Sequence, residues 1–439
     1  MNFRNSIGLV ALIAAIGLVP AVRADNDNDS VLNAVYIHSN NPLPGKNSVL
    51  AYHRNPATGT LTEMPGSPFF TGGTGYLNAT EVLGPDDTDL EIVATPDHRF
   101  LYVTNQGSDT IAGFAIQSDG SLRPVPGSPF PSGGVEPCSI GIDGALMFVV
   151  NRGDQAGASP GTHKPNYSSF LILPEGSLLP LPWQEPSMVL GASPTTAQLA
   201  PGGALMFDSH LFENPFPVPG FPPFVPPFSS ELHSYKISPF GQLTAAAQTA
   251  PTFPPTPPFI LGLQVHPTKK ILYAGYVVAS LLATYTYDEA GNMTLVGTTA
   301  GAPNGGLCWI AISPDAKTLY TADAITDQID VYSISADPLH PVLVQTVNLA
   351  GVKNPANFNL TATFWDTTPF QLKTSPDGAY LYVVNHEVSN LTGGNATGNT
   401  VHTLKIGMGG TLTELPSSPL TFPLNEVPID AHPLGVVVF

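Results

Sequence analysis

Charged side chains are scarce in this sequence of 439 residues, and four residues could form a hydrolytic site. His386 and Glu387 are adjacent, and a histidine paired with a carboxylate is a common general acid–base unit. Arg152 could bind a carboxylate or orient a carbonyl oxygen through its fork of N–H donors. His432, close to the end of the sequence, could supply a second imidazole. We therefore predict catalytic roles for Arg152, His386, Glu387 and His432.

A segment rich in proline and phenylalanine, residues 212–229, could take part in binding. Phe212 to Phe228 contains seven Pro and five Phe in 17 residues, so it should be extended and similar to polyproline II. Such a segment could cover a site as a hydrophobic lid, dock a protein partner, or pack flat against its own scaffold. From this region and its start we predict the following substrate- or partner-binding residues: His210, Glu213, Phe216, Phe221 and Phe224.

The composition limits the scaffold that positions these residues. The chain contains 47 Pro and 42 Gly, and only 11% of its residues are charged, well below the usual share of roughly a quarter. With 42% hydrophobic residues it has enough apolar surface to fold, which excludes disorder caused by charge. Pro and Gly at this density would repeatedly interrupt the helices of a bundle. The composition therefore favours a large all-β protein with many short strands.

A motif with an aromatic residue at a fixed place recurs seven times. An apolar run and a tight turn such as Ser375-Pro-Asp-Gly precede six of the seven copies. An alternating strand follows, and then a fourth strand that usually begins with Gly, as at Gly120-Ser-Leu-Arg. Four antiparallel strands in each of seven units predict a seven-bladed β-propeller over residues 33–439. The recurring aromatic residues are Tyr36, Tyr102, Phe148, Phe207, Tyr273, Tyr320 and Tyr382.

The first unit lacks its innermost strand, and His432 to Phe439 look like that strand. We expect these residues to pair with the N-terminal blade and close the ring, which removes the open sheet edges. The turns between first and second strands are tight, whereas the long connections, among them 152–167, 212–229 and 386–399, all fall on the other face. Long irregular loops on a rigid scaffold commonly carry binding sites. We therefore expect the working face on the long-loop side.

The segment Leu101-Tyr-Val-Thr-Asn105, together with the Ser-Pro-Asp-Gly turns and Gly-x-Leu-Thr strands, resembles the seven-bladed lactonase family. This family comprises 6-phosphogluconolactonase-like propellers and relatives that act as carboxymuconate cycloisomerases. The resemblance covers nearly all of the mature chain and implies both the propeller and an activity on lactones. Family enzymes carry histidines near the starts of inner strands, often after proline. In this chain Cys138, Thr195 and Phe370 follow those prolines, and only the last blade keeps a histidine, His432.

The first 24 residues have the pattern of a secretory signal peptide, with Arg4, an apolar stretch to Val19 and small residues before Asp25. Residues 25–32 are polar and are expected to be disordered. The apolar stretch is too short for a comfortable membrane span, and no second one follows. We therefore expect a secreted or periplasmic protein without a membrane span.

Net charge and cysteines narrow the range of partners. Without Arg4 and Arg23 the chain keeps 13 Lys and Arg against 33 Asp and Glu, a net charge of −20. This balance disfavours nucleic acid and strongly anionic substrates. Cys138 and Cys308 begin inner strands of nearly opposite blades, so we expect free thiols and not a disulfide. No His, Cys, Asp or Glu triad has metal-ligand spacing, and we expect neither a metal nor a cofactor.

Two functions remain open from the sequence alone. The first is hydrolysis of a lactone or a related small cyclic ester at the channel mouth, with water activated by the His386–Glu387 pair and Arg152 polarising the carbonyl. The second is a non-catalytic secreted binding or cell-surface propeller that uses residues 212–229. In both cases we expect a monomer that binds a lactone-like or sugar-like small molecule, or a protein partner, at the long-loop face.

Overall fold

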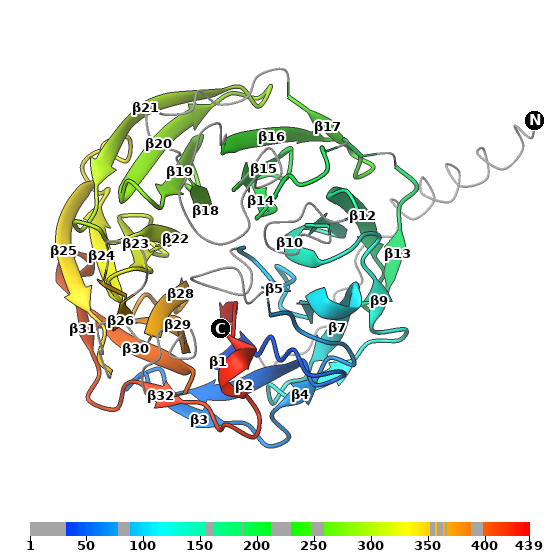
Figure 1. The fold of residues 1–439 in the computed structure, drawn as a ribbon, viewed down its shortest axis with the longest axis horizontal. Coiled ribbons are helices and arrows are strands. Elements are labelled where there is room, and N and C mark those ends of the chain that lie inside the picture. Colours follow the sequence, from blue (N-terminus) through cyan, green and yellow to red (C-terminus); the bar gives the residue numbers. More distant parts are fainter. Residues whose placement is uncertain are drawn as a thin grey trace, which may run out of the picture.

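The computed structural model describes residues 32–77, 88–153, 162–183, 185–186, 188–211, 230–246, 259–351, 356–357, 363–364, 367–387 and 398–439. The predicted signal peptide and the segment 212–229, with Glu213, Phe216, Phe221 and Phe224, lie outside these residues. Seven antiparallel sheets surround a central axis as the blades of a propeller (Figure 1). The predicted seven-bladed, all-β fold is therefore confirmed.

Each of the first four blades has four main strands, ordered from the axis outward. Blade one consists of β33 (Val436–Val438), β1 (Ala34–His38), β2 (Ser48–Arg54) and β3 (Leu61–Glu63), with β4 (Phe69–Phe70) beside β2. Blade two consists of β5 (Ile92–Ala94), β6 (Phe100–Asn105), β7 (Thr110–Ile116) and β8 (Leu122–Pro124), with β9 (Phe130–Pro131) beside β7. Blade three consists of β10 (Pro137–Asp143), β11 (Leu146–Asn151), β12 (Asn166–Ile172) and β13 (Leu178–Pro180). Blade four consists of β14 (Gln198–Leu199), β15 (Leu205–His210), β16 (Glu231–Ile237) and β17 (Leu243–Ala245).

The remaining three blades follow the same order. Blade five consists of β18 (Ile260–Val265), β19 (Ile271–Tyr276), β20 (Leu281–Tyr287) and β21 (Met293–Ala300). Blade six consists of β22 (Leu307–Ile312), β23 (Thr318–Asp323), β24 (Gln328–Ser333) and β25 (Val342–Asn348). Blade seven consists of β28 (Thr367–Thr374), β29 (Tyr380–Glu387), β30 (Thr400–Ile406) and β31 (Leu412–Glu414), with β32 (Leu420–Thr421) beside β30. A separate pair, β26 (Ala356–Asn357) and β27 (Thr363–Phe364), and the short 3-10 helices η1 (Gln106–Ser108), η2 (Met408–Gly410) and η3 (Ile429–Ala431) complete the described elements.

The ring closes by pairing of the last strand with the first. β33 is antiparallel to β1, with Val437 opposite Tyr36, and the backbone N–H of Phe439 donates to the carbonyl of Ala34 at 2.8 Å. Arg54 strengthens this closure, because its Nε donates to the Phe439 carbonyl at 3.1 Å. The closing strand begins later than the sequence predicted, at Val436, because His432 adopts a left-handed backbone conformation after η3.

The repeated aromatic residue connects neighbouring blades through its hydroxyl group. In four blades the tyrosine hydroxyl donates to a backbone carbonyl in the next blade, near the start of its fourth strand. These hydrogen bonds join Tyr36 to Gly120 (2.6 Å), Tyr102 to Gly176 (2.7 Å), Tyr273 to Pro338 (2.7 Å) and Tyr382 to Gly59 (3.0 Å). Phe207 lacks a hydroxyl, and Ser234, its cross-strand partner, donates to Gly291 at 2.6 Å instead. Buried tyrosine hydroxyls usually need such a partner, and these four carbonyls supply it.

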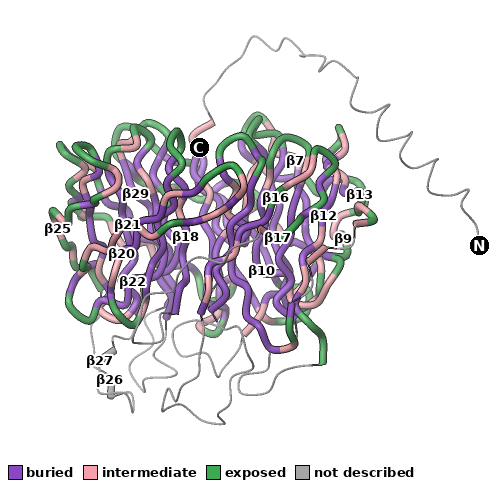
Figure 2. The backbone as a smooth tube through the Cα atoms, turned by 90° about the horizontal axis from the view of Figure 1, so that it is seen from above, coloured by how far each residue is buried: buried purple, intermediate pink, exposed green. Residues whose placement is uncertain are grey.

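The two faces of the disc differ in the connections that they carry. The turn face holds the tight turns between first and second strands, such as Thr95–His98. The loop face lies at the opposite ends of these strands, where second strands end and third strands begin. Figure 2 shows that buried residues follow the strands while exposed residues gather at their ends. Cys138 in β10 and Cys308 in β22 lie on different blades and form no disulfide with each other, as predicted. In the part of the chain that the structure describes, no helix is long and apolar enough to span a membrane.

Candidate functional site

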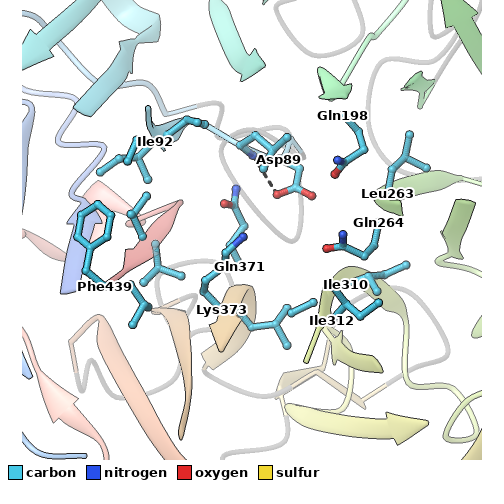
Figure 3. A pocket seen from close by; sticks show the side chains of 18 of the residues that line it. Asp89, Ile92, Gln198, Leu263, Gln264, Ile310, Ile312, Gln371, Lys373 and Phe439 are labelled. Carbon is cyan, nitrogen blue, oxygen red and sulfur yellow. Dashed lines mark hydrogen bonds between the residues drawn. The ribbon is translucent and has the colours of Figure 1, made fainter. Parts of the chain in front are cut away.

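The inner strands surround a cavity of about 340 Å³ on the propeller axis (Figure 3). Its walls come from β5, β14, β18, β22, β28 and β33, so it is the central channel of the propeller. This volume lies within the roughly 300–1,000 Å³ that is typical of small-molecule sites.

One residue of each inner strand pairs with the repeated aromatic residue, and together these residues form a layer around the axis. They are Val437, Val93, Gly141, Gln198, Gln264, Ala311 and Lys373, in the order of the blades. The layer is polar on blades four, five and seven and apolar on the others. Gln198 and Gln264 use their Nε2 atoms to donate to the carbonyls of Leu199 and Val265, at 3.2 and 2.9 Å. The cavity therefore presents amide groups on one side and hydrocarbon on the other.

A short segment, Thr88–Glu91, crosses the channel on the loop-face side of this layer, and we call it the strap. It leads into β5 of blade two but is bound by blades three, four, six and seven. The bonds are Ile140 N to Leu90 O (3.0 Å), Asp89 N to Thr195 O (3.1 Å), Trp309 Nε1 to Thr88 O (2.7 Å) and Gln371 Nε2 to Glu91 Oε2. The strap is thus held in place from several sides of the channel, and it carries the carboxyl group of Asp89 into the cavity.

Asp89 of the strap and Lys373 line the cavity and form its charged centre, whereas Glu91 is fully buried beside them. The carboxylate of Asp89 points into the channel toward Gln198 and Gln264 (Figure 3). Burial raises the pKa of Asp89 to about 7, although the Leu90 N–H and the charge of Lys373 oppose this rise. A group with a pKa near the working pH is well suited to take up and release a proton.

Glu91 and Lys373 have altered titration for related reasons. Burial, and next the charge of Asp89, raise the pKa of Glu91 well above its usual value, while Thr88 donates to its Oε1 at 2.5 Å. Burial lowers the pKa of Lys373, and Asp89 opposes that change. The Lys373 side chain remains accessible to solvent although protein surrounds it, because it lines the cavity. Asp89 and Lys373 therefore offer a proton acceptor and a cation in one water-accessible space.

The predicted residues of blade seven come together at the ring closure. A column of rings runs from Trp309 through Phe370 and His386 to His432, with centroid separations of 3.6, 4.2 and 5.4 Å. Burial lowers the pKa of His386 well below its usual value, and the pKa of His432 to about 4 despite the charges of Asp430 and Glu387. Both imidazoles are therefore neutral near pH 7 and are weak proton acceptors.

Glu387 is fully buried in the same region. Its Oε2 accepts a hydrogen bond from the Gly398 N–H at 2.6 Å, and its own N–H donates to Asn399 Oδ1 at 2.8 Å. The structure thus brings Glu387 and His432 together, since the Glu387 charge acts on the His432 ring.

Arg152 and His210 lie on blades three and four, away from this group. Arg152 is only 2% exposed, and its Nε donates to Ser193 Oγ at 2.9 Å in the segment that leads into blade four. His210 ends β15, with its Nε2 3.2 Å from the Tyr167 hydroxyl and 3.4 Å from Asp208 Oδ2. The predicted residues are therefore divided between two places on the loop side, and their catalytic and binding roles remain predictions.

A second buried pair of carboxyl groups lies between blades five and six. Asp323 is fully buried, and neither of its carboxyl oxygens has a hydrogen-bond partner within the described residues. Burial and the neighbouring Asp330 raise its pKa well above the usual value. Gly305 packs so closely that a Cβ atom there would lie 2.9 Å from Asp323 Cγ. No three His, Cys, Asp or Glu side chains in the described ranges are arranged to hold a metal ion.

Asp89, Glu91 and Lys373 are not among the residues predicted from the sequence. A signal was present, since a carboxylate or ammonium group in an inner strand of a propeller must face the channel or a neighbouring blade. Lys373 stands two residues before the turn Ser375-Pro-Asp-Gly, where the corresponding residues of other blades are Val93 and Ala311. Alignment of the inner strands would have shown this exception.

Comparisons with known proteins agree with the architecture. A family model described as "Lactonase, 7-bladed beta-propeller" matches residues 45–158 and 231–393. A comparison with curated protein sequences finds no match.

Solved structures with similar folds share little sequence with this chain. The periplasmic gluconolactonase of Pseudomonas aeruginosa superposes with a TM-score of 0.63 at 15% identity, covering 92% of this chain and 98% of its own. A Bacteroides fragilis protein provisionally named a 6-phosphogluconolactonase gives 0.60 at 15% identity, covering 94% and 99%. A hypothetical selenium-binding protein of Sulfolobus tokodaii gives 0.61 at 15% identity, covering 93% of each chain. At this identity the likeness concerns the fold alone.

Proposed function

Because the chain belongs to the lactonase family of seven-bladed β-propellers, we propose that it hydrolyses a small lactone in the channel cavity. The observation that carries the proposal is the placement of Asp89 and Lys373 in one enclosed, water-accessible space of suitable volume. Lactone hydrolysis needs a group that removes a proton from water and a group that stabilises the oxyanion. These two side chains meet both needs.

The proposed reaction is a general-base hydrolysis. Water attacks the lactone carbonyl while the Asp89 carboxylate takes one of its protons, and the Lys373 ammonium stabilises the negative oxygen that forms. The tetrahedral intermediate then collapses, the ring C–O bond breaks, and the leaving alkoxide receives the proton from Asp89. The product is a hydroxy acid, and Asp89 returns to its starting state.

The walls of the cavity favour a neutral lactone with hydroxyl groups. Gln198 and Gln264 can bind hydroxyls, while the carboxylate form of Asp89 disfavours a phosphate at the same place. Two of the structural relatives carry names that refer to gluconolactone or its 6-phosphate. We infer that an unphosphorylated sugar lactone is the better candidate substrate for this chain.

The place of the protein in the cell is part of the same proposal. The N-terminal residues have the pattern of a secretory signal peptide, and one structural relative is periplasmic by name. We infer a secreted or periplasmic monomer. Cell fractionation with N-terminal sequencing tests this inference, and a cytoplasmic protein that keeps Met1 would contradict it.

The decisive experiment is a hydrolysis assay on glucono-δ-lactone and on a simple alkyl δ-lactone, corrected for spontaneous hydrolysis. We expect activity in the wild type, its loss in Asp89→Asn, and its retention in Glu289→Gln, a matched change at a carboxyl group whose side chain is 91% exposed. Wild-type protein without activity on any lactone would reject the proposal, and binding without turnover would support a non-catalytic binding propeller.

The same assay separates the channel from the site predicted on the loop side. Arg152→Ala and His386→Ala remove the two residues with the clearest predicted roles there. If they abolish hydrolysis in folded protein while Asp89→Asn does not, the catalytic site is at the loop face and the channel assignment is wrong.

A further inference from the structure

Solvent exposure changes sharply along the channel axis. In the layer level with the strap, Glu91, Trp309 and Gln371 are 0%, 1% and 6% exposed. One layer closer to the turn face, Gln198 and Gln264 are partly exposed and Lys373 is exposed. Solvent therefore reaches the cavity residues on the turn-face side of the strap, and hardly reaches those level with it.

The strap is a well-anchored barrier. Its backbone or side chains bond to blades three, four, six and seven, and its own blade adds a bond from Thr104 N to Glu91 O at 3.0 Å. Opening a path past the strap would require several buried hydrogen bonds to break together. Each buried polar group left without a partner destabilises the open state, so such opening is rare.

At its other end the cavity extends to residues of the turn face. Thr95, Pro96 and His98 from the turn of blade two line it, together with Phe439 at the end of the last strand. The His98 ring packs on Phe439 with 4.4 Å between centroids, and Pro96 and His98 are exposed. These residues form a rim between the cavity and bulk solvent.

We propose that small molecules enter the channel cavity through the turn face, past Pro96, His98 and Phe439, and not past the strap. The second strands, by contrast, end on the loop face. The inference rests on the proposed function for the identity of the ligand, but its route follows from the cavity alone. The turn-face rim therefore limits the size of the molecules that reach Asp89.

The route can be tested without an activity assay, because Lys373 reports on access to the cavity. Formaldehyde with cyanoborohydride methylates accessible amines, and peptide mass spectrometry measures the methylation of Lys373 relative to the exposed Lys405. A bulky polyethylene glycol maleimide is attached to Pro96→Cys at the rim or, as the matched control, to Leu43→Cys on the loop face, where Leu43 is 54% exposed. Cys138 and Cys308 are 0% and 1% exposed, which protects them from the reagent.

We expect the label at position 96 to remove most of the Lys373 methylation, and the label at position 43 to leave it unchanged. The proposed route would be wrong if only the label at position 43 removed the Lys373 methylation, or if Lys373 were methylated equally in both labelled proteins. Circular dichroism confirms folding of each variant, and His98→Cys replaces Pro96→Cys if the latter does not fold. If the wild-type protein hydrolyses no lactone but shows this methylation pattern, the proposed reaction is wrong and the proposed route is still supported.

Discussion

The channel and the boundary between blades five and six each contain a buried pair of carboxyl groups, but their surroundings differ. Asp89 and Glu91 lie beside a cavity of about 340 Å³ that also contains the Lys373 amine. Asp323 and Asp330 lie in packed protein, with Gly305 against the Asp323 carboxyl and no cation among the groups that shift its pKa. Burial raises the pKa of a carboxyl group in both places.

A raised pKa therefore does not identify a catalytic residue by itself. Burial alone raises the pKa of any carboxyl group, because the charged form loses its hydration. Chemistry also requires space for a substrate, a route for water and a group that stabilises developing charge. The channel pair has all three, and the pair between blades five and six has none of them within the described residues.

The largest expected difference between the two pairs is in catalysis. Asp89→Asn should lower kcat/KM for the lactone by about 10²–10⁴-fold, the usual effect of losing a general base. Asp323→Asn should leave kcat/KM unchanged, because its side chain is fully buried away from the cavity. Steady-state kinetics of both variants at neutral pH check this prediction. An equal loss of kcat/KM in the two variants would show that the two carboxyl pairs do not differ in catalysis.

Replacement of the cation in the channel should have the next largest effect. Lys373→Met keeps most of the side-chain length and removes the charge, so kcat should fall by about 10²-fold if the ammonium stabilises the oxyanion. In the same variant the pKa of Asp89 should rise further, because Lys373 is one of the groups that hold it down. The pH–rate profile should therefore shift to higher pH, and an unshifted profile would show that Lys373 does not act on Asp89.

The amide side of the channel should affect substrate binding more weakly. Gln264→Leu should raise KM for a hydroxylated lactone by about 3–10-fold, since one hydrogen bond contributes about 0.5–1.5 kcal/mol. KM for an alkyl lactone should not change, because it has no hydroxyl to bind. A rise in both values would indicate a general change of cavity shape and would remove the argument for a sugar-type lactone.

The smallest expected difference between the two pairs is in stability, where they should behave alike. The pKa of Asp89 is about 7 in the folded protein against 3.8 ordinarily, so the folded state binds more protons between these values. Stability from this group therefore falls as pH rises through that window, and Asp323 acts in the same direction. Asp89→Asn and Asp323→Asn should each raise Tm above the wild-type value at about pH 8, and the gain should vanish near pH 4.

Thermal unfolding of the variants and the wild type across this pH range measures the effect. The difference in Tm between variant and wild type isolates the contribution of the aspartate. Protonation of the neutral, buried histidines destabilises both proteins in acid, and this effect cancels in the difference. A lower Tm at high pH in both variants would mean that these carboxyl groups stabilise the fold, contrary to their burial.

The fold was predictable from the sequence because the blades share the same tight turn and the same kind of contact with the next blade. Tyr102 and Tyr382 each reach a carbonyl of the next blade, and the turn before each contains Pro-Asp, so the motif recurs. The channel site was not found, because Asp89 and Lys373 are 284 positions apart and only closure of the ring brings them together. The histidines were selected for their chemistry, whereas the burial that makes His386 a weak base depends on packing against Phe370.

The pairing of β33 with β1 has a consequence for the order of the chain. These two strands lie side by side and antiparallel, with Phe439 next to Ala34, which is the arrangement of every other first and second strand in the ring. A short turn that joins Phe439 to Asn33 would complete the seventh such hairpin, and new termini could then be cut at an exposed turn of another blade. The ring should tolerate circular permutation, because its geometry marks no blade as the beginning.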